Sequence, residues 1–266
     1  MLSIQHLIVA LAESSSVQTQ IIRNALDELG IKRIEVFEQG EALLEYIARY
    51  KPDVVMSAYH LPDMTAGEMI FRMRGHVDLR DIPFILVSSE TNPNLLDPMR
   101  QAGLMGILPK PFALPELSKV INDTLDFLGA DQSDSDNEID YADLSILLVD
   151  DSVMARRHIR TVLERLGFEK ITESWSGKDA LPLIDNTLFD LVLTDYNMPM
   201  MDGCELTSYI RTHSMQSSVP IIMISSEENA ERLAAAKAAG VSAVIGKPFE
   251  TSAIRKLLRA QLTRQQ

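Results

Sequence analysis

The sequence predicts an α/β protein made of two doubly wound (βα)5 domains, each with a five-stranded parallel sheet. Three observations lead to this prediction. The chain repeats itself at a fixed offset, each copy alternates short apolar runs with helix-length segments, and an acidic stretch separates the copies. Five βα units in about 120 residues are typical of a doubly wound parallel sheet.

The repeat gives the domain organisation, because its landmarks recur 137 positions apart without a gap, as from Asp53 to Asp190. The other pairs are Leu29-Gly30 with Leu166-Gly167, Gly40 with Gly177, Tyr59 with Tyr196, Pro62 with Pro199, Pro83 with Pro220, Gly103 with Gly240, and Lys110-Pro111-Phe112 with Lys247-Pro248-Phe249. Common residues match by chance in two or three places, but not in a whole series that keeps one register.

The domain boundaries follow from the repeat and from charge. We expect one domain at residues 1–130, a linker at 131–143 and a second domain at 144–266. The linker sequence, DQSDSDNEIDYAD, contains six acidic residues and no basic residue. Such a segment repels itself and has little apolar surface to bury, so we expect an extended tether.

The elements of the second copy follow in order from its pattern. Strands are expected at SILLV (145–149), KITES (170–174), DLVLT (190–194), PIIMIS (220–225) and SAVIG (242–246). The continuous apolar runs among them suit strands that are buried on both faces. Helices rich in Ala, Leu, Arg and Glu are expected at 152–166 and 228–239. A last helix is expected at 251–264, because Thr251 can cap its amino terminus and apolar residues follow at helical spacing.

Composition excludes several classes of protein. The content of 46% hydrophobic and 24% charged residues is that of a globular protein. A net charge of −13 argues against general nucleic-acid binding or an anionic membrane surface, since phosphates attract basic surfaces. Cys204 is the only cysteine, which rules out an intrachain disulfide and a thiolate metal cluster and favours a reducing compartment.

No segment has the length and apolar character of a membrane span. The apolar run from Leu7 to Ala12 is short and no Lys or Arg precedes it, so it is interpreted as a buried first strand rather than a signal peptide. We therefore expect a soluble, cytoplasmic protein.

Polar residues gather where the predicted strands of the second copy end. The first strand is followed by Asp150, Asp151 and Ser152, the third by Asp195, while the fourth ends in Ser225 and the fifth is followed by Lys247. Ligands of doubly wound sheets bind at the carboxyl ends of the strands. Clustered Asp oxygens suit Mg²⁺, and a metal with one Lys suits a phosphoryl group. One carboxylate would then be a nucleophile that forms an acyl phosphate.

The motifs ILLVDDS, LVLTDYNMPMMDG, IIMISS and GKPF, in this order and spacing, closely resemble the receiver domain of two-component response regulators, the CheY-like family with a flavodoxin-like fold. The resemblance covers essentially all of residues 144–266. It implies that Asp195 is the phosphoacceptor and that Asp150, Asp151 and the backbone carbonyl of Asn197 bind Mg²⁺ together with Asp195. It also implies that Ser225 bonds the phosphoryl oxygens, that Lys247 pairs with the phosphoryl group, and that the Lys-Pro bond is cis.

Some positions of the second copy keep two interpretations. A single Asp at a strand end is more often a helix cap than a nucleophile, and only the joint match favours phosphorylation. Asn197 and Glu227 either tune the lifetime of the phosphoryl group or are solvated polar groups. Many family members carry Tyr or Phe three residues before the Lys, where this chain has Val244; the sequence leaves open whether this replacement alters the switch or signalling proceeds by a smaller shift of the fourth helix and fifth strand.

The first copy lacks most of these acids. Glu13 stands at the position of Asp150, Ser14 at that of Asp151 and Ala58 at that of Asp195, while Ser88 and Lys110 remain. A methyl group cannot accept a phosphoryl group, and one carboxylate is a poor Mg²⁺ site. Lys110 is expected to pair with Glu13. The first domain is thus interpreted as a degenerate receiver that serves in docking, dimerisation or inhibition of its twin, or that binds another signal.

The leading interpretation is a two-component response regulator without a separate output domain. A sensor histidine kinase or phosphotransfer protein would phosphorylate Asp195 with Mg²⁺ as cofactor, and this would change binding to an unidentified downstream protein, with a homodimer also allowed. Apart from self-phosphorylation and autodephosphorylation, no enzymatic activity is expected. The alternative is a phosphate sink or a non-switching scaffold. A phosphatase acting on other substrates is disfavoured, since no second acid-base pair accompanies the nucleophile.

Overall fold

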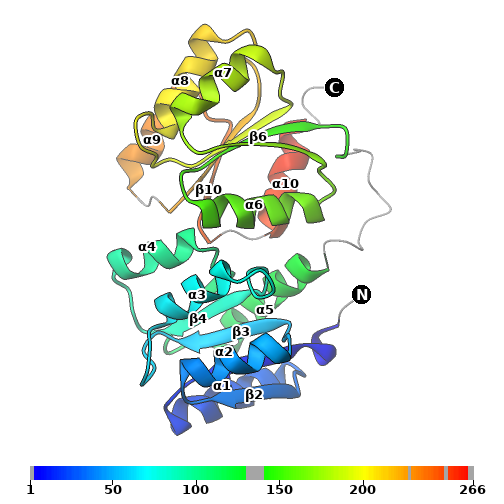
Figure 1. Cartoon of the computed structure of the whole chain (residues 1–266), viewed down its shortest axis with the longest axis vertical. Helices are drawn as coiled ribbons and strands as arrows, with labels where there is room; N and C mark the ends of the chain where they lie inside the picture. Colours follow the sequence, from blue (N-terminus) through cyan, green and yellow to red (C-terminus); the bar gives the residue numbers. More distant parts are fainter. Residues whose placement is uncertain (1–2, 130–140, 227–228, 249–250, 263–266) are drawn as a thin grey trace. The chain divides into compact units, whose positions relative to one another are not determined.

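The chain folds into two compact units, which divide between residues 132 and 133. This computed structural model describes residues 3–129, 141–226, 229–248 and 251–262 (Figure 1). Linker residues 131–140, Glu227 and Phe249 lie outside the described residues. Each unit contains a five-stranded parallel sheet with helices on its faces, which confirms the predicted fold class.

The first unit has the strand order β2-β1-β3-β4-β5. Its strands are β1 (Ile8–Ala12), β2 (Arg33–Phe37), β3 (Val54–Ala58), β4 (Phe84–Ser88) and β5 (Gly106–Pro109). Its helices are a 3-10 turn at Ile4–His6, then α1 (Ser16–Glu28), α2 (Gly40–Arg49), α3 (Ala66–Gly75), α4 (Pro93–Gln101) and α5 (Leu114–Leu128). The strand order reverses at β1, so the ends of β1 and β3 flank the switch point where doubly wound sheets bind ligands.

The second unit repeats this topology, with the order β10-β9-β8-β6-β7. Its strands are β6 (Ser145–Val149), β7 (Lys170–Ser174), β8 (Leu191–Thr194), β9 (Ile221–Ser225) and β10 (Ala243–Gly246). Its helices are α6 (Val153–Arg165), α7 (Gly177–Asn186), α8 (Gly203–His213), α9 (Ala230–Ala239) and α10 (Thr251–Leu262). The expected strands agree within one residue. α9 begins two residues later than expected, because Asn229 caps it by accepting from two backbone N–H groups.

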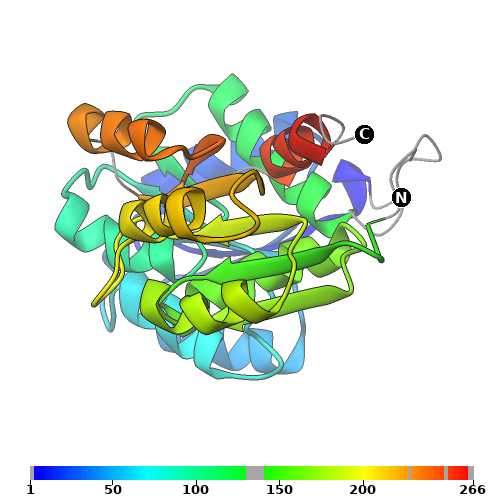
Figure 2. The same ribbon diagram turned by 90° about the horizontal axis from the view of Figure 1, so that it is seen from above.

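Helices cover both faces of each sheet. In the second unit α6 and α10 lie on one face, and α7, α8 and α9 follow one another across the other (Figures 1 and 2). In the first unit α1 lies beside α5, while α2, α3 and α4 form the opposite row. Central strands such as β3, β4 and β9 are buried along their whole length. This burial explains why their sequences read as continuous apolar runs instead of alternating ones.

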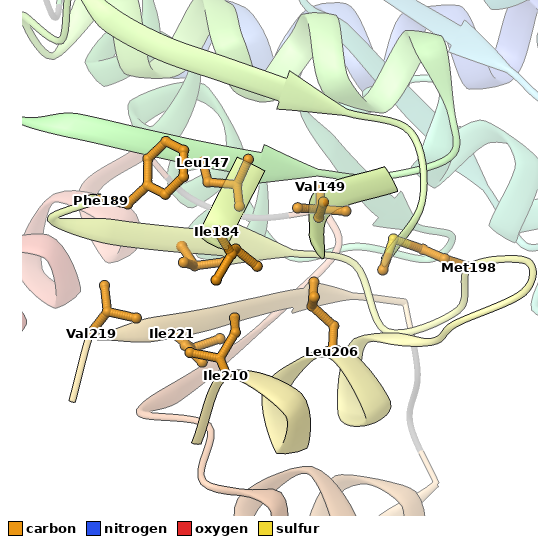
Figure 3. Close-up of a cluster of buried hydrophobic side chains, with 11 residues drawn as sticks. Leu147, Val149, Ile184, Phe189, Met198, Leu206, Ile210, Val219 and Ile221 are labelled. Atoms are coloured by element: carbon orange, nitrogen blue, oxygen red, sulfur yellow. The ribbon is translucent and has the colours of Figure 1, made fainter. Parts of the chain in front are cut away.

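One face of the second sheet packs on α7 and α8 through a cluster of buried apolar side chains (Figure 3). Leu147 and Val149 of β6 point toward Leu206 and Ile210 of α8. Burying a side chain of this size stabilises the fold by about 1.5–3 kcal/mol. The cluster reaches Met198, in the loop after β8, and so anchors the segment that follows Asp195.

Several landmarks of the repeat have the same structural role in both units. Asp53 precedes β3 and accepts a hydrogen bond from the backbone N–H of Ile8 at 2.7 Å, and Asp190 accepts one from Ser145 at 2.8 Å. These carboxylates tie the first residues of neighbouring strands together. The repeated aspartates therefore hold the sheet at its amino-terminal edge, away from the strand ends that carry the predicted site.

A buried arginine was not anticipated from the sequence. Arg74 of α3 is 5% exposed and donates to the backbone carbonyls of Ala102 and Gly103 at 2.8 and 3.0 Å. Arg211 occupies the same position of the repeat and donates to Gly240 at 3.0 Å. Burial lowers the pKa of Arg74 to about 10, so the guanidinium stays charged at neutral pH. Both arginines fasten the turn before the fifth strand.

The expected linker is shorter at its carboxyl end than its composition indicated. Tyr141 is buried, with its ring 4.7 Å from that of Phe168, and Asp143 forms an ion pair with Lys170 at 2.9 Å. Residues 141–143, which the acidic composition assigned to the tether, thus pack against the second unit. Packing of the Tyr141 ring against Phe168 therefore holds this segment on the second unit, although its composition is polar.

Among the described helices, none combines the length and the apolar character that crossing a bilayer requires.

Candidate functional site

Two aspartates meet at the switch point of the second sheet. β6 and β8 are neighbours, with Val149 opposite Thr194, so the residues that follow them lie side by side. The backbone N–H of Asp195 donates to the carbonyl of Val149 at 2.8 Å. Asp150 and Asp195 are 0% and 2% exposed. The parallel strands thus bring two carboxylates together that are 45 residues apart in the chain, as the sequence predicted.

Lys247 joins the two aspartates. It follows β10, and its backbone N–H donates to the carbonyl of Ser225 at 2.7 Å. Its Nζ lies 2.8 Å from Oδ2 of Asp150 and 3.0 Å from Oδ1 of Asp195. Burial disfavours the ammonium form, but the charges of Asp195 and Asp150 outweigh it and raise the pKa of Lys247. The site therefore holds a buried cation between two buried acids.

One carboxylate oxygen at the site has no partner among the residues that the structure describes. Oδ2 of Asp195 is buried and accepts no hydrogen bond from any described residue. Burial raises the pKa of Asp195 to about 6, an effect that the charge of Lys247 opposes and the charge of Asp150 reinforces. A buried polar atom without a partner is costly, so a ligand that satisfies it would bind with a gain in free energy.

A third acid completes a cluster that suits a divalent cation. Oxygens of Asp150, Asp151 and Asp195 all lie within 4.8 Å of one another, and Asp151 is exposed. Partial desolvation of its carboxyl by the surrounding protein and the charge of Asp150 raise the pKa of Asp151. Mg²⁺ prefers oxygen ligands, and three carboxylates whose oxygens lie this close together can supply several of them. The three carboxylates and the unpartnered Oδ2 therefore fit Mg²⁺.

The remaining predicted residues lie near this cluster along the chain or sheet. Ser225 ends β9, which lies between β8 and β10, and it is 1% exposed. Asn197 follows Asp195 by two residues in the loop before α8, where it is exposed. The predicted Lys247-Pro248 cis bond is present, and Lys110-Pro111 is also cis. The bonds of the Ser225 hydroxyl to a phosphoryl group and of the Asn197 carbonyl to a metal stay predictions.

The helix that follows Asp195 approaches it very closely. An added Cβ at Gly203 would lie 2.2 Å from the backbone oxygen of Asp195, so no larger residue fits without a shift of the backbone. The first turn of α8 is fixed by a capping box. The Asp202 carboxylate accepts from the backbone N–H of Glu205 at 2.8 Å, and the Glu205 carboxylate accepts from the backbone N–H of Asp202 at 3.0 Å. The first unit has Ala66 at the position of Gly203, and this close approach was not evident from the sequence.

The matching edge of the first unit is chemically different. Nζ of Lys110 lies 2.6 Å from Oε2 of Glu13, which confirms the expected ion pair. Oε1 of Glu13 accepts from the backbone N–H of Ser15 at 2.9 Å. Ala58 ends β3, where β8 is followed by Asp195, and it is buried. Both oxygens of Glu13 are satisfied, so the described residues of this edge offer no counterpart of Asp195 and no unpartnered carboxylate oxygen.

Two arginines beside the site were missed by sequence reasoning. Arg156 of α6 donates to the backbone carbonyl of Asp150. The guanidinium of Arg232, on α9, lies 4.8 Å from the ring centre of Tyr196, which follows Asp195 directly. At the repeat offset these arginines correspond to Thr19 and Leu95. This difference between the copies was the signal that could have identified them.

Both halves of the chain match one family. Residues 9–122 and residues 146–259 each match the response regulator receiver domain. Chemotaxis protein CheY-3 of Vibrio cholerae serotype O1 is 37% identical over 115 residues, a match that covers 43% of this chain and 88% of that protein.

Similar solved structures include one receiver protein of single-domain size and one of nearly the length of this chain. Chemotaxis response regulator CheY4 of Vibrio cholerae is 30% identical, with a TM-score of 0.42, covering 45% of this chain and 98% of that one. A two-component system response regulator/GGDEF domain protein is 20% identical, with a TM-score of 0.42, covering 97% of this chain and 98% of that one.

Proposed function

Because the chain belongs to the response regulator receiver domain family, with one such domain in each half, we propose that Asp195 is its single phosphoacceptor. The observation that supports this proposal best is the carboxylate of Asp195, which is buried beside Asp150 and Lys247 and keeps one oxygen without a partner among the described residues. The first unit has Ala58 in its place and would act as a regulatory, docking or dimerisation module.

The proposed reaction is the transfer of a phosphoryl group from a phosphohistidine of a sensor kinase or phosphotransfer protein. An oxygen of the Asp195 carboxylate attacks phosphorus and forms a P–O bond. The P–N bond of the donor breaks, its electron pair stays on the imidazole nitrogen, and the imidazole takes up a proton. Lys247, with its Nζ 3.0 Å from Asp195, would neutralise negative charge on the phosphoryl oxygens. Ser225 would donate a hydrogen bond to one of them.

Asp150, Asp151 and Asp195 would hold Mg²⁺, with the backbone carbonyl of Asn197 as a further ligand. The ion supplies positive charge that stabilises the transferring phosphoryl oxygens. Lys247 holds Asp150 and Asp195 in place by its two hydrogen bonds of 2.8 and 3.0 Å. The burial of Asp150, Asp195 and Lys247 would limit the access of bulk water to the carboxylate.

The affinity for Mg²⁺ should depend on the protonation of Asp195. Its carboxyl must be ionised to bind the metal, and its pKa is raised to about 6 by burial. We therefore expect a nearly constant affinity above pH 7 and a loss of about tenfold for each pH unit below pH 6, because protons then compete with the metal. Titration of Mg²⁺ against the fluorescence of Trp175, the single tryptophan, measures this. An affinity unchanged between pH 7 and pH 5 would contradict the assignment.

Phosphorylation is proposed to change the interactions of the chain by shifting a conformational equilibrium. Beryllofluoride with Mg²⁺ imitates the phosphoryl group on an aspartate, so it should change small-angle scattering of the full chain and the set of proteins captured from a lysate. The Asp195→Asn variant, which cannot hold beryllofluoride, is the matched control. Unchanged scattering and capture in the wild type would favour a phosphate sink or a scaffold over a switch.

A further inference from the structure

The turn that carries Asp150 and Asp151 is held by a side chain from the following helix. Arg156 of α6 is largely buried, with a side-chain exposure of 14%. Its Nη1 donates to the backbone carbonyl of Asp150, the residue whose carboxylate bonds Lys247. The same turn is fixed from its other side, since Oδ1 of Asp150 accepts from the backbone N–H of Ser152 at 2.8 Å.

Arg156 is itself held by the neighbouring strand. Its Nε lies 3.4 Å from Oε2 of Glu173 on β7, and the other oxygen of Glu173 accepts from Nη1 of Arg160 at 2.8 Å. Glu173 thus orients the guanidinium, and Arg160 orients Glu173. The side chain of Arg156 therefore reaches the carbonyl of Asp150 in one defined direction.

The first unit provides an internal comparison. At the repeat offset Thr19 takes the place of Arg156 and Val36 that of Glu173. The hydroxyl of Thr19 donates to the backbone carbonyl of Glu13, the counterpart of Asp150, at 3.4 Å. The carbonyl thus has a side-chain donor in both units, but only in the unit with the acidic cluster is that donor a guanidinium paired with an acid on the neighbouring strand. A guanidinium donor oriented by an acid is thus found, of the two units, in the one that has the aspartates.

From this geometry we infer that Arg156 is a positioning residue for the acidic cluster: by binding the carbonyl of Asp150, it sets the turn from which Asp150 and Asp151 present their carboxylates to a divalent cation. The inference rests on the proposed function, because it assumes that the cluster binds Mg²⁺. The turn is set by the hydrogen bond that Arg156 donates to this carbonyl, and not by the positive charge of Arg156. The positive charge of the guanidinium alone would weaken the binding of a nearby cation.

The two properties of Arg156 can be separated by substitution. Arg156→Ala removes both the donor and the charge. Arg156→Thr removes the charge but places at 156 the hydroxyl donor that the first unit uses at 19. Neither variant leaves Glu173 unpaired, because its bond to Arg160 remains. Loss of a group that orients metal ligands typically weakens metal affinity about tenfold or more.

The test is a Mg²⁺ titration of the full-length wild type, Arg156→Ala and Arg156→Thr, followed by the fluorescence of Trp175. This residue follows Ser174, whose carbonyl accepts the backbone N–H of Asp150 at 3.2 Å. We expect Arg156→Ala to weaken Mg²⁺ binding about tenfold and Arg156→Thr to stay within about threefold of the wild type. Thermal unfolding of each variant in the absence of Mg²⁺ confirms that the titrated protein is folded.

Three results would overturn the inference. If both variants bind Mg²⁺ more tightly and to the same extent, Arg156 acts only through its charge. If Arg156→Ala lowers the unfolding temperature but binds Mg²⁺ as the wild type does, the residue is only structural. If the wild type itself gives no saturable response, the proposed metal site fails, and the inference fails with it. The first two results leave the proposed function intact.

Discussion

Acetyl phosphate is expected to label the wild-type chain in the presence of Mg²⁺ and to leave the Asp195→Asn variant unlabelled. An amide nitrogen or oxygen is a far weaker nucleophile than a carboxylate, so the effect should be the loss of all label. The substitution keeps the shape of the side chain, and Lys247 keeps its partner Asp150 at 2.8 Å. The variant should therefore fold, which circular dichroism can verify. Phosphate incorporation over time measures the effect.

The matched companion variant restores a carboxylate to the first unit. Ala58→Asp in the Asp195→Asn background should remain without efficient labelling, because Ser14 still supplies no acid and Glu13 is already paired with Lys110 at 2.6 Å. Labelling at a rate near that of the wild type would mean that this edge needs no acid at position 14. The interpretation of the first unit as a receiver unable to react would then be wrong.

Replacing Lys247 by methionine should have the second large effect. The substitution leaves Asp150 and Asp195, 0% and 2% exposed, without their shared cation. Removing one partner of a buried ion pair typically costs about 3–5 kcal/mol. We expect that loss in the unfolding free energy of the second unit at neutral pH without Mg²⁺. The pKa of Asp195, already raised to about 6, should rise further. Urea unfolding followed by Trp175, which lies in this unit, measures the change.

Two controls separate this effect from a general loss of stability. Mg²⁺ should recover much of the stability of Lys247→Met, because the metal replaces the missing positive charge and binds only the folded state. Lys110→Met removes the equivalent lysine of the first unit, and it should leave the Trp175 transition unchanged. A Lys247→Met protein as stable as the wild type without Mg²⁺ would show that the lysine is not needed to hold the two acids.

The sequence allowed the fold and the convergence of the candidate site residues to be predicted, because both follow from the order of elements. Continuous apolar runs marked β6 and β9 nearly to the residue, and the carboxyl ends of parallel strands must meet along one edge. The convergence of Asp150, Asp195 and Lys247 therefore needed no knowledge of side-chain geometry. The same logic located the Lys110–Glu13 pair of the first unit.

Features that depend on local distances were not predictable from the sequence. Nothing in the sequence distinguishes Gly203 from the other glycines, because its close approach to the backbone oxygen of Asp195 is a feature of the folded structure. Arg156 and Arg74 resembled surface charges, because a helical pattern alone does not reveal which backbone carbonyl a long side chain reaches. Tyr141 lies in an acidic segment, and its packing against Phe168 depends on the tertiary fold. Composition describes a segment on its own and does not include such contacts.

The most direct test of the account is the location of the phosphoryl group. After reaction of the wild-type chain with acetyl phosphate and Mg²⁺, borohydride trapping followed by peptide mass spectrometry should find one modified residue per chain, Asp195, and no modified residue within 1–130. A modified aspartate or glutamate in the first unit, or an unmodified Asp195 in a folded protein that has bound Mg²⁺, would contradict the assignment of Asp195 as the single phosphoacceptor.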